Sequence, residues 1–183
     1  MNLHMPDAKL TDVFLMPGDY FVGDERYRVR TLLGSCVSVT LWHPSLRVGA
    51  MSHFLLPGSG HRKAHDKPGM YGDAAMDLLL DGLARHGVAP TQCQAKIFGG
   101  GAMFPRSPNV RANVPDIGQQ NGDFARRLLQ QKGIHVVSES LFGEGHRQLI
   151  FTIRSGDVLS RQVPPEPKAA APTGRTREKH EWN

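Results

Sequence analysis

A cysteine and a histidine in the first third of the chain could act as a nucleophile and its base. Cys36 follows Gly34 and Ser35, and His53 lies on the next apolar run. The thiolate is the nucleophilic form of cysteine, and a free thiol is mostly protonated near neutral pH. A histidine in contact can accept the thiol proton and stabilise the thiolate as an ion pair. The pair therefore indicates covalent catalysis, although a buried cysteine packed as a small hydrophobe beside a structural histidine would show the same pattern.

The glycine before the cysteine adds to this chemistry. Gly34 lets the backbone turn sharply and come close to a substrate. Backbone N–H groups in such a turn, including that of Ser35, could donate hydrogen bonds to an oxyanion, which is usually a large contribution to catalysis. The Ser35 hydroxyl is a weaker candidate nucleophile than the Cys36 thiol.

Two predicted strands position the pair. Residues 32–42 and 48–56 are rich in Val, Thr, Leu and aromatic side chains, which suit a half-buried sheet. A tight turn over residues 43–46, with proline at its second position, would join them as an antiparallel hairpin. Cys36 then falls directly opposite His53, where Cβ atoms are about 4.5–5.5 Å apart. A longer loop is equally compatible, and a slip of one residue would send His53 to the other face.

The remaining pattern predicts an α+β fold, with a mixed or antiparallel β-sheet core layered with two main helices, in an α/β sandwich of cysteine-hydrolase type. An apolar stripe predicts a helix over 74–86, capped by Asp73 and ended by Gly87. Asp116 would cap a second helix that buries Ile117, Phe124 and Leu128 on one face and closes at Gly133. Further strands are expected at 13–16, within 20–29, at 94–98, at 134–138, and as a hairpin of 148–154 with 158–163.

The composition fits one domain and excludes several classes of protein. Of 183 residues, 39% are hydrophobic and 21% are charged, as in ordinary globular domains. We expect a flexible leader at 1–11, a domain at 12–163 and a disordered tail at 164–183. The chain shows no apolar run long enough to span a bilayer and no apolar signal core. Its +5 charge is scattered, without a nucleic-acid motif. Two cysteines without an export signal favour reduced thiols in the cytoplasm.

Three other features are weaker. Cys93 lacks a glycine turn and is expected to pack in the core. His61, His65 and Asp66 could ligate a metal, but their Gly-rich loop is expected to be solvated or to cover the site as a lid. Residues 99–101 lack the Lys-Ser/Thr of a phosphate loop and are expected to form a tight turn near the site. No metal and no cofactor are predicted.

Several motifs in this order carry a family resemblance. The Leu-Gly-Ser-Cys run that ends at Cys36 is followed by the His-Phe-Leu-Leu-Pro run that begins at His53. With the runs at 71–76, 95–103 and 117–121 and, weakly, at 145–147, they resemble the CheD family of chemoreceptor glutamine deamidases over roughly residues 12–163. One departure is Gln120, where the family often has arginine.

The resemblance implies a protein-glutamine glutaminase, a cysteine amidohydrolase that acts on methyl-accepting chemotaxis receptors. Cys36 would attack a glutamine side-chain amide, and His53 would activate the thiol and protonate the departing ammonia. Water would then release glutamate from a thioester. Thr31 would be the third member, orienting His53 through its hydroxyl.

The sequence also offers candidate substrate-contacting residues and two alternative functions. Phe98, Gly99 and Gly100 are candidates for a loop that contacts the substrate. One alternative function is a binding module that docks on receptors or on a CheC-type phosphatase, a partner that the resemblance also implies. The other is a cysteine hydrolase of a different amide.

Overall fold

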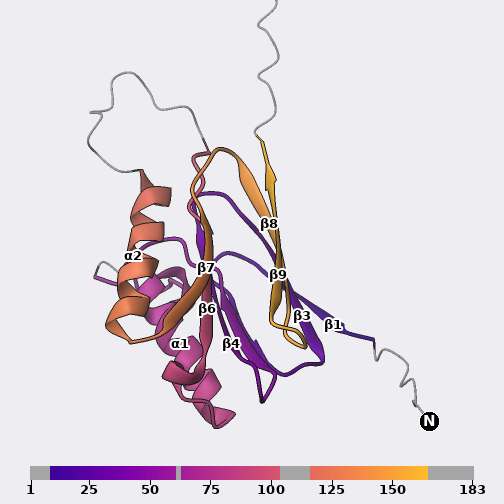
Figure 1. The fold of residues 1–183 in the computed structure, drawn as a ribbon. Helices are drawn as coiled ribbons and strands as arrows, with labels where there is room; N and C mark the ends of the chain where they lie inside the picture. Colours follow the sequence, from indigo (N-terminus) through magenta and orange to yellow (C-terminus); the bar gives the residue numbers. More distant parts are fainter. Residues whose placement is uncertain (1–8, 61–62, 104–115, 165–183) are drawn as a thin grey trace, which may run out of the picture.

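Two stacked β-sheets and two helices form three layers (Figure 1). The computed structural model describes residues 9–60, 63–103 and 116–164. One sheet lies in the middle, packed against the helices, and we call it the central sheet. The other sheet covers its opposite face, and we call it the outer sheet. This arrangement confirms the predicted α+β fold with mixed sheets and two helices.

The central sheet has five strands in the order β2-β5-β4-β6-β7. All neighbours are antiparallel except the parallel β6–β7 pair. Because β4 is the middle strand and Val37–Leu41 are all buried, the sheet is covered on both faces. The strands are β2 (Tyr20–Gly23), β4 (Val37–His43), β5 (Val48–Ser52), β6 (Gln94–Gly99) and β7 (His135–Leu141).

The outer sheet has four strands in the order β1-β3-β8-β9. The β1–β3 pair is parallel and the other two pairs are antiparallel. The predicted hairpin near the chain's end is confirmed, since β8 pairs with β9. The strands are β1 (Thr11–Leu15), β3 (Tyr27–Leu33), β8 (His146–Thr152) and β9 (Asp157–Val163).

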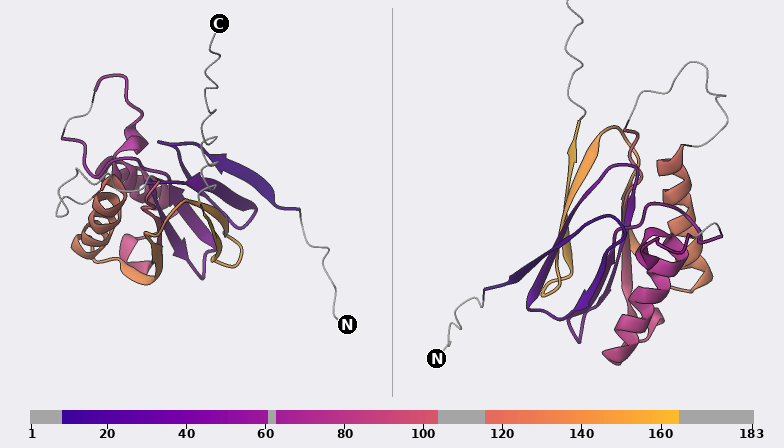
Figure 2. Two further views of the ribbon diagram at one scale, coloured as in Figure 1. Left: turned by 90° about the horizontal axis from the view of Figure 1, so that it is seen from above. Right: turned by 180° about the vertical axis from the view of Figure 1, so that it is seen from behind.

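Helices α1 (Gly72–Arg85) and α2 (Ile117–Gln131) cover the face of the central sheet that points away from the outer sheet (Figure 2). Short 3-10 helices form at Pro68–Met70 and Pro90–Gln92. No helix in the described ranges combines the length and apolar character needed to cross a bilayer.

Two apolar cores hold the layers together. The first lies between the helices and the central sheet, where Val37 and Leu41 of β4 belong to one cluster with Leu79 of α1. The second lies between the two sheets and includes Leu33 of β3 and Phe98 of β6. The last residue of β3 and the first residue of β4 are therefore anchored in different cores.

The single strand predicted over 32–42 is wrong. β3 ends at Leu33 in the outer sheet, and β4 begins at Val37 in the central sheet. Residues 34–36 cross between the sheets. Favourable strand residues on both sides obscured this break, which only the Gly-Ser pair indicated.

The other strand predictions hold, with shifts at their ends. The region 20–29 holds the whole of β2 and the start of β3. Strands were correctly predicted near 13–16, 94–98 and 134–138. The described strands begin at Thr11 and end at Val163. The domain boundaries themselves stay a prediction, because most of the leader and tail lie outside the described residues.

The first helix confirms its predicted stripe but not its predicted cap. Met76, Leu79 and Leu83 are buried, and the chain leaves α1 through Gly87 at φ +72. Asp73 does not cap the helix, because it lies within the first turn and its Oδ2 accepts hydrogen bonds from the N–H and Oγ of Ser59.

The second helix confirms its cap and part of its predicted buried face, since Leu128 packs against the core. Asp116 Oδ1 accepts a hydrogen bond of 2.8 Å from Gln119 N. Ile117 is 36% exposed, and the buried positions are Gly118, Asn121, Gly122, Ala125 and Leu129. Small residues face inward because the backbone approaches closely: a Cβ at position 118 would lie 2.5 Å from the oxygen of Gly100.

Candidate active site

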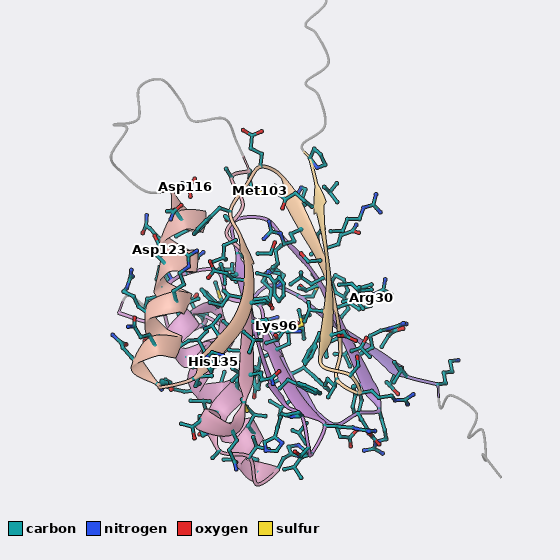
Figure 3. All side chains as sticks on the ribbon, viewed as in Figure 1. Arg30, Lys96, Met103, Asp116, Asp123 and His135 are labelled. Atoms are coloured by element: carbon teal, nitrogen blue, oxygen red, sulfur yellow. The ribbon has the colours of Figure 1, made fainter. Side chains whose placement is uncertain are left out.

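Cys36 lies at the end of the turn that crosses from the outer sheet to the central sheet. The carbonyl oxygens of Gly34 and Cys36 each accept a hydrogen bond of 2.8 Å, from the N–H groups of Gly101 and Gly100. A Cβ at position 34 would lie 2.7 Å from Met103 Sδ. Figure 3 places Met103 at the end of the molecule where β8 begins. The thiol-bearing turn is therefore held by the backbone that follows β6.

Position 99, at the end of β6, packs against the Cys36 turn and has to be glycine. Gly99 has φ +111, and a Cβ there would lie 2.3 Å from the carbonyl oxygen of Cys36. Both the conformation and the space exclude a side chain. The tight turn predicted near the site over residues 99–101 is present, and its donors are used on the Cys36 turn rather than on a phosphate.

His53 follows β5 directly, and its backbone is fixed at both ends. Its N–H donates to Asp19 O at 3.0 Å, and its carbonyl accepts from Gly18 N at 2.8 Å. The next residue, Phe54, exchanges two hydrogen bonds of 3.0 Å with Val37, the residue after Cys36. A hydrogen-bonded pair thus joins the neighbours of the two reactive residues.

The prediction that Cys36 lies directly opposite His53 is wrong, because the register between the two segments is shifted by two residues. Because His43 pairs with Val48 rather than with position 46, the loop is longer than predicted, and Arg47 adopts φ +49 to close it. In the register of the Val37–Phe54 pair, Cys36 and His53 are diagonal neighbours, which lie about 7–8 Å apart. A shift of two keeps both side chains on the same face.

Thr31 comes to the same place from the outer sheet. Its Oγ1 lies 2.8 Å from His53 Nδ1 and donates a hydrogen bond of 2.8 Å to Leu15 O. A hydroxyl has a single hydrogen. When that hydrogen goes to Leu15, Oγ1 accepts from Nδ1–H, so the neutral ring carries its proton on Nδ1. His53 Nε2 is then an acceptor, and it is buried without a hydrogen-bond partner among the described residues.

Burial favours the neutral forms of both reactive groups. Desolvation lowers the pKa of His53, against the opposing effects of the nearby Leu15 carbonyl and of the Asp19 charge. Desolvation raises the pKa of the Cys36 thiol, and hydrogen bonding from its own backbone N–H acts in the opposite direction. No hydrogen bond joins the two side chains in the described structure. The arrangement therefore favours a neutral thiol and a neutral imidazole at rest over a preformed ion pair.

Asn121 is a part of the site that the sequence did not reveal as such. It is fully buried on α2, and its Nδ2 donates to Ser35 O at 3.1 Å and to Leu55 O at 2.7 Å. One carbonyl precedes the thiol residue and the other lies two residues after His53. Asn121 therefore ties the two reactive segments to one helix. The available signal was a carboxamide on a helix face otherwise made of glycine, alanine and leucine.

Comparison with known proteins decides the family. The CheD family model, described as CheD chemotactic sensory transduction, matches residues 55–162. The chain belongs to the CheD family. The matched segment contains Asn121 and begins just after His53.

Similar proteins align with most of the chain. A probable chemoreceptor glutamine deamidase CheD 2 of Albidiferax ferrireducens is 55% identical over 86% of this chain and 90% of its own length. A probable chemoreceptor glutamine deamidase CheD 1 of Chromobacterium violaceum is 40% identical over 90% of this chain and 84% of its own. A probable chemoreceptor glutamine deamidase CheD of Pseudomonas syringae pv. syringae is 39% identical, covering 86% of this chain and 88% of its own.

A cavity lies along the segment that follows His53 in this CheD family member. Its volume is about 450 Å³, and it lies between the segment after His53 and the start of α2. Gln120 lines it. The other lining residues are Leu56, Pro57, Gly58, Lys63, Asp66, Met70, Tyr71 and Ile117.

The remaining sequence candidates take other places. Phe98 is buried in the core between the sheets, so its side chain is not on a substrate loop. Cys93 is buried in the other core, as predicted, and desolvation raises its pKa to about 11. Both cysteines are free.

The proposed metal alternative finds no support in the described residues. Asp66 Oδ2 accepts hydrogen bonds from Lys63 N and Tyr71 Oη. Within residues 9–60, 63–103 and 116–164, no group of three or more His, Cys, Asp or Glu side chains could hold a metal ion. His61 lies outside those ranges.

Proposed function

We propose that this CheD family member deamidates glutamine side chains of chemoreceptors to glutamate, with release of ammonia. The observation that carries the proposal is the buried His53, whose Nδ1 is bonded to Thr31 and whose Nε2 has no partner among the described residues. The partly buried Cys36 packs against the core between the two sheets, the side from which Thr31 contacts His53. The relatives' names supply the substrate, since each is called a probable chemoreceptor glutamine deamidase.

The first half-reaction forms a thioester. Cys36 Sγ attacks the side-chain amide carbon of the glutamine while the thiol proton moves to His53 Nε2. The tetrahedral intermediate collapses with cleavage of the C–N bond, and the leaving nitrogen takes the proton from Nε2 and departs as ammonia. Thr31 Oγ1 accepts from Nδ1–H throughout, which keeps the ring oriented and stabilises the imidazolium.

The second half-reaction returns the enzyme to its starting state. A water molecule attacks the thioester carbon and gives one proton to His53 Nε2. The C–S bond breaks, the proton returns to the sulfur, and the substrate leaves as a carboxylic acid, which loses its remaining proton to solvent and becomes a carboxylate.

Backbone N–H groups of the turn would stabilise the intermediate. The N–H of Cys36 interacts with its own sulfur and lowers the thiol pKa. One well-placed donor of this kind contributes about 10²–10³ in kcat.

Intact-mass analysis of a purified chemoreceptor cytoplasmic fragment tests this function. Incubation with the wild-type protein should convert glutamines to glutamates, with equimolar ammonia release. Cys36→Ala and His53→Ala should each abolish both signals. Cys93→Ala is the matched control and should retain them. Undiminished conversion by Cys36→Ala would exclude the mechanism, and conversion of unrelated glutamine peptides at equal rates would indicate a general amide hydrolase.

The cellular setting is a further part of the proposal. Two free cysteines fit a reducing compartment, and we place the protein in the cytoplasm. The family resemblance also makes a CheC-type phosphatase a proposed partner. Co-purification of such a phosphatase with the Cys36→Ala protein tests this interaction separately from turnover.

A further inference from the structure

One face of the outer sheet carries no helix. Both helices pack on the central sheet (Figures 1 and 2). Along β3, Val29, Thr31 and Leu33 point into the interior, so Arg30 and Leu32 point outward. Figure 3 shows Arg30 on the side away from the helices.

Strand register builds an apolar surface on this face. One row crosses all four strands, because Phe14 pairs with Arg30, Arg30 with Ile150, and Ile150 with Leu159. A second row joins Leu32, Gln148 and Arg161, and Met16 follows β1 at the same level. We call the apolar members the outer apolar face; they are Phe14, Met16, Leu32, Ile150 and Leu159.

This surface is more apolar than a solvent-facing sheet face usually is. Phe14 is 58% exposed, Met16 56%, Leu32 45% and Leu159 68%. Antiparallel sheets with one face in water normally alternate apolar inward and polar outward residues. Neighbouring exposed apolar side chains of this size mark interaction surfaces.

The same two rows contain two arginines outside any ion pair, and the charge of one of them, Arg30, also lowers the pKa of Asp12. Arg30 and Arg161 form no ion pair within the described parts of the chain, and both are exposed. Arg28, on the next row, is instead paired with Asp12 at 2.6 Å. The unpaired arginines favour an acidic partner. They disfavour a second copy of this chain, because a symmetric contact would bring like charges together.

We propose that the outer apolar face is an exosite that binds a second segment of the chemoreceptor substrate, an amphipathic helix with acidic side chains beside its apolar stripe. The inference rests on the proposed function. Thr31 and Leu32 are consecutive residues of β3, one facing the catalytic histidine and the other facing the exosite. The thiol-bearing turn begins two residues after Leu32, so a substrate held on this face lies close to the nucleophile.

Steady-state kinetics with the chemoreceptor cytoplasmic fragment tests the exosite. The variant Leu159→Ser/Arg161→Glu changes two exposed side chains of β9, a strand that contributes no residue to the catalytic site. We expect KM to rise about tenfold, through loss of apolar contact and reversal of a charge, with kcat unchanged. Arg30→Glu should act in the same direction. Leu46→Ser and Arg127→Glu, exposed residues outside this face, are matched controls and should leave KM unchanged.

A short glutamine peptide separates the exosite from the chemistry. Such a peptide reaches the nucleophile but not β9, so the exosite variants should convert it as fast as wild type does. Binding of the fragment to Cys36→Ala should weaken with the same substitutions and with added salt. Loss of peptide turnover with fragment binding intact would contradict the deamidase chemistry alone. Unchanged KM and unchanged fragment binding in both exosite variants would overturn the exosite. The exosite would also be overturned if the only effect of the substitutions were to dissociate a dimer of this chain or to abolish binding to anionic vesicles.

Discussion

Thr31 Oγ1 lies 2.8 Å from His53 Nδ1 and joins the interior of the outer sheet to the end of β5 in the central sheet. The same hydroxyl donates to Leu15 O, so the contact sets the tautomer of the histidine as well as its orientation. The two sheets must therefore stack correctly for Nε2 to be available as a base.

Removing the Thr31 hydroxyl should slow the reaction more than it weakens substrate binding. In Thr31→Val, Nδ1–H loses its acceptor, and the ring can adopt the tautomer with its proton on Nε2. We expect kcat to fall by at least about tenfold, and by no more than the 10²–10⁴ that a general base contributes. Thr31→Ser keeps the hydroxyl and should retain most activity. Equal kcat values for the valine and wild-type proteins would show that the contact is only structural.

The thiol should react with alkylating agents in a way that reports its environment. Burial raises the pKa of Cys36 above its usual value of 9.0, so alkylation by iodoacetamide should accelerate only as the pH rises past that value. Peptide mapping should find the label on Cys36 rather than on the buried Cys93, whose pKa is about 11. Rapid alkylation at neutral pH would instead reveal a preformed thiolate.

His53 should make the protein less stable in acid. Its folded-state pKa lies below the ordinary 6.5, so the unfolded chain binds a proton that the folded protein does not. Stability therefore rises with pH across the interval between the two pKa values, and it falls as the pH drops below about 6.5. Urea denaturation at several pH values should show a steeper loss for wild type than for His53→Gln.

The reactive residues were more predictable from sequence than the structure that positions them. Cysteine, glycine and histidine have chemistry that is visible one residue at a time, and Asp116 is a cap that depends only on local geometry. The break at Gly34 is not local in this sense. Whether a favourable strand run continues or crosses to a second sheet depends on partners far along the chain, here β8 for one half and β6 for the other.

The same reason explains the misplaced face of α2. Large apolar residues predicted that Ile117, Phe124 and Leu128 would face the core. Leu128 does pack against the core, but the closest contacts use Gly118, which lies against the backbone of Gly100, and Gly122, which lies against the ring of Phe142. Close approach between backbones is a tertiary property that a single-helix pattern does not reveal.

Asn121 should contribute to both stability and rate. Asn121→Ala removes the Nδ2 donor that now bonds the carbonyl oxygens of Ser35 and Leu55. A buried polar group left unsatisfied costs about 1–3 kcal/mol, which urea denaturation can measure. Asn121→Asp should be worse, because it can place a carboxylate against the same oxygens. A full kcat in a destabilised Asn121→Ala protein would limit its role to stability.

Alanine substitutions at two glycines with positive φ, Gly99 and Gly133, distinguish displacement of the Cys36 turn from the cost of a left-handed backbone alone. Gly99→Ala would place a Cβ 2.3 Å from the carbonyl oxygen of Cys36, whereas a Cβ at Gly133 meets nothing within 4 Å. Gly133→Ala should cost only the left-handed conformation, about 1–2 kcal/mol. Gly99→Ala has to displace the turn as well, so we expect a larger loss of stability and a loss of deamidation even under conditions where the protein remains folded. Calorimetry and receptor-fragment turnover on the two variants check this, and equal activity at matched fractions folded would show that the position of the turn does not govern catalysis.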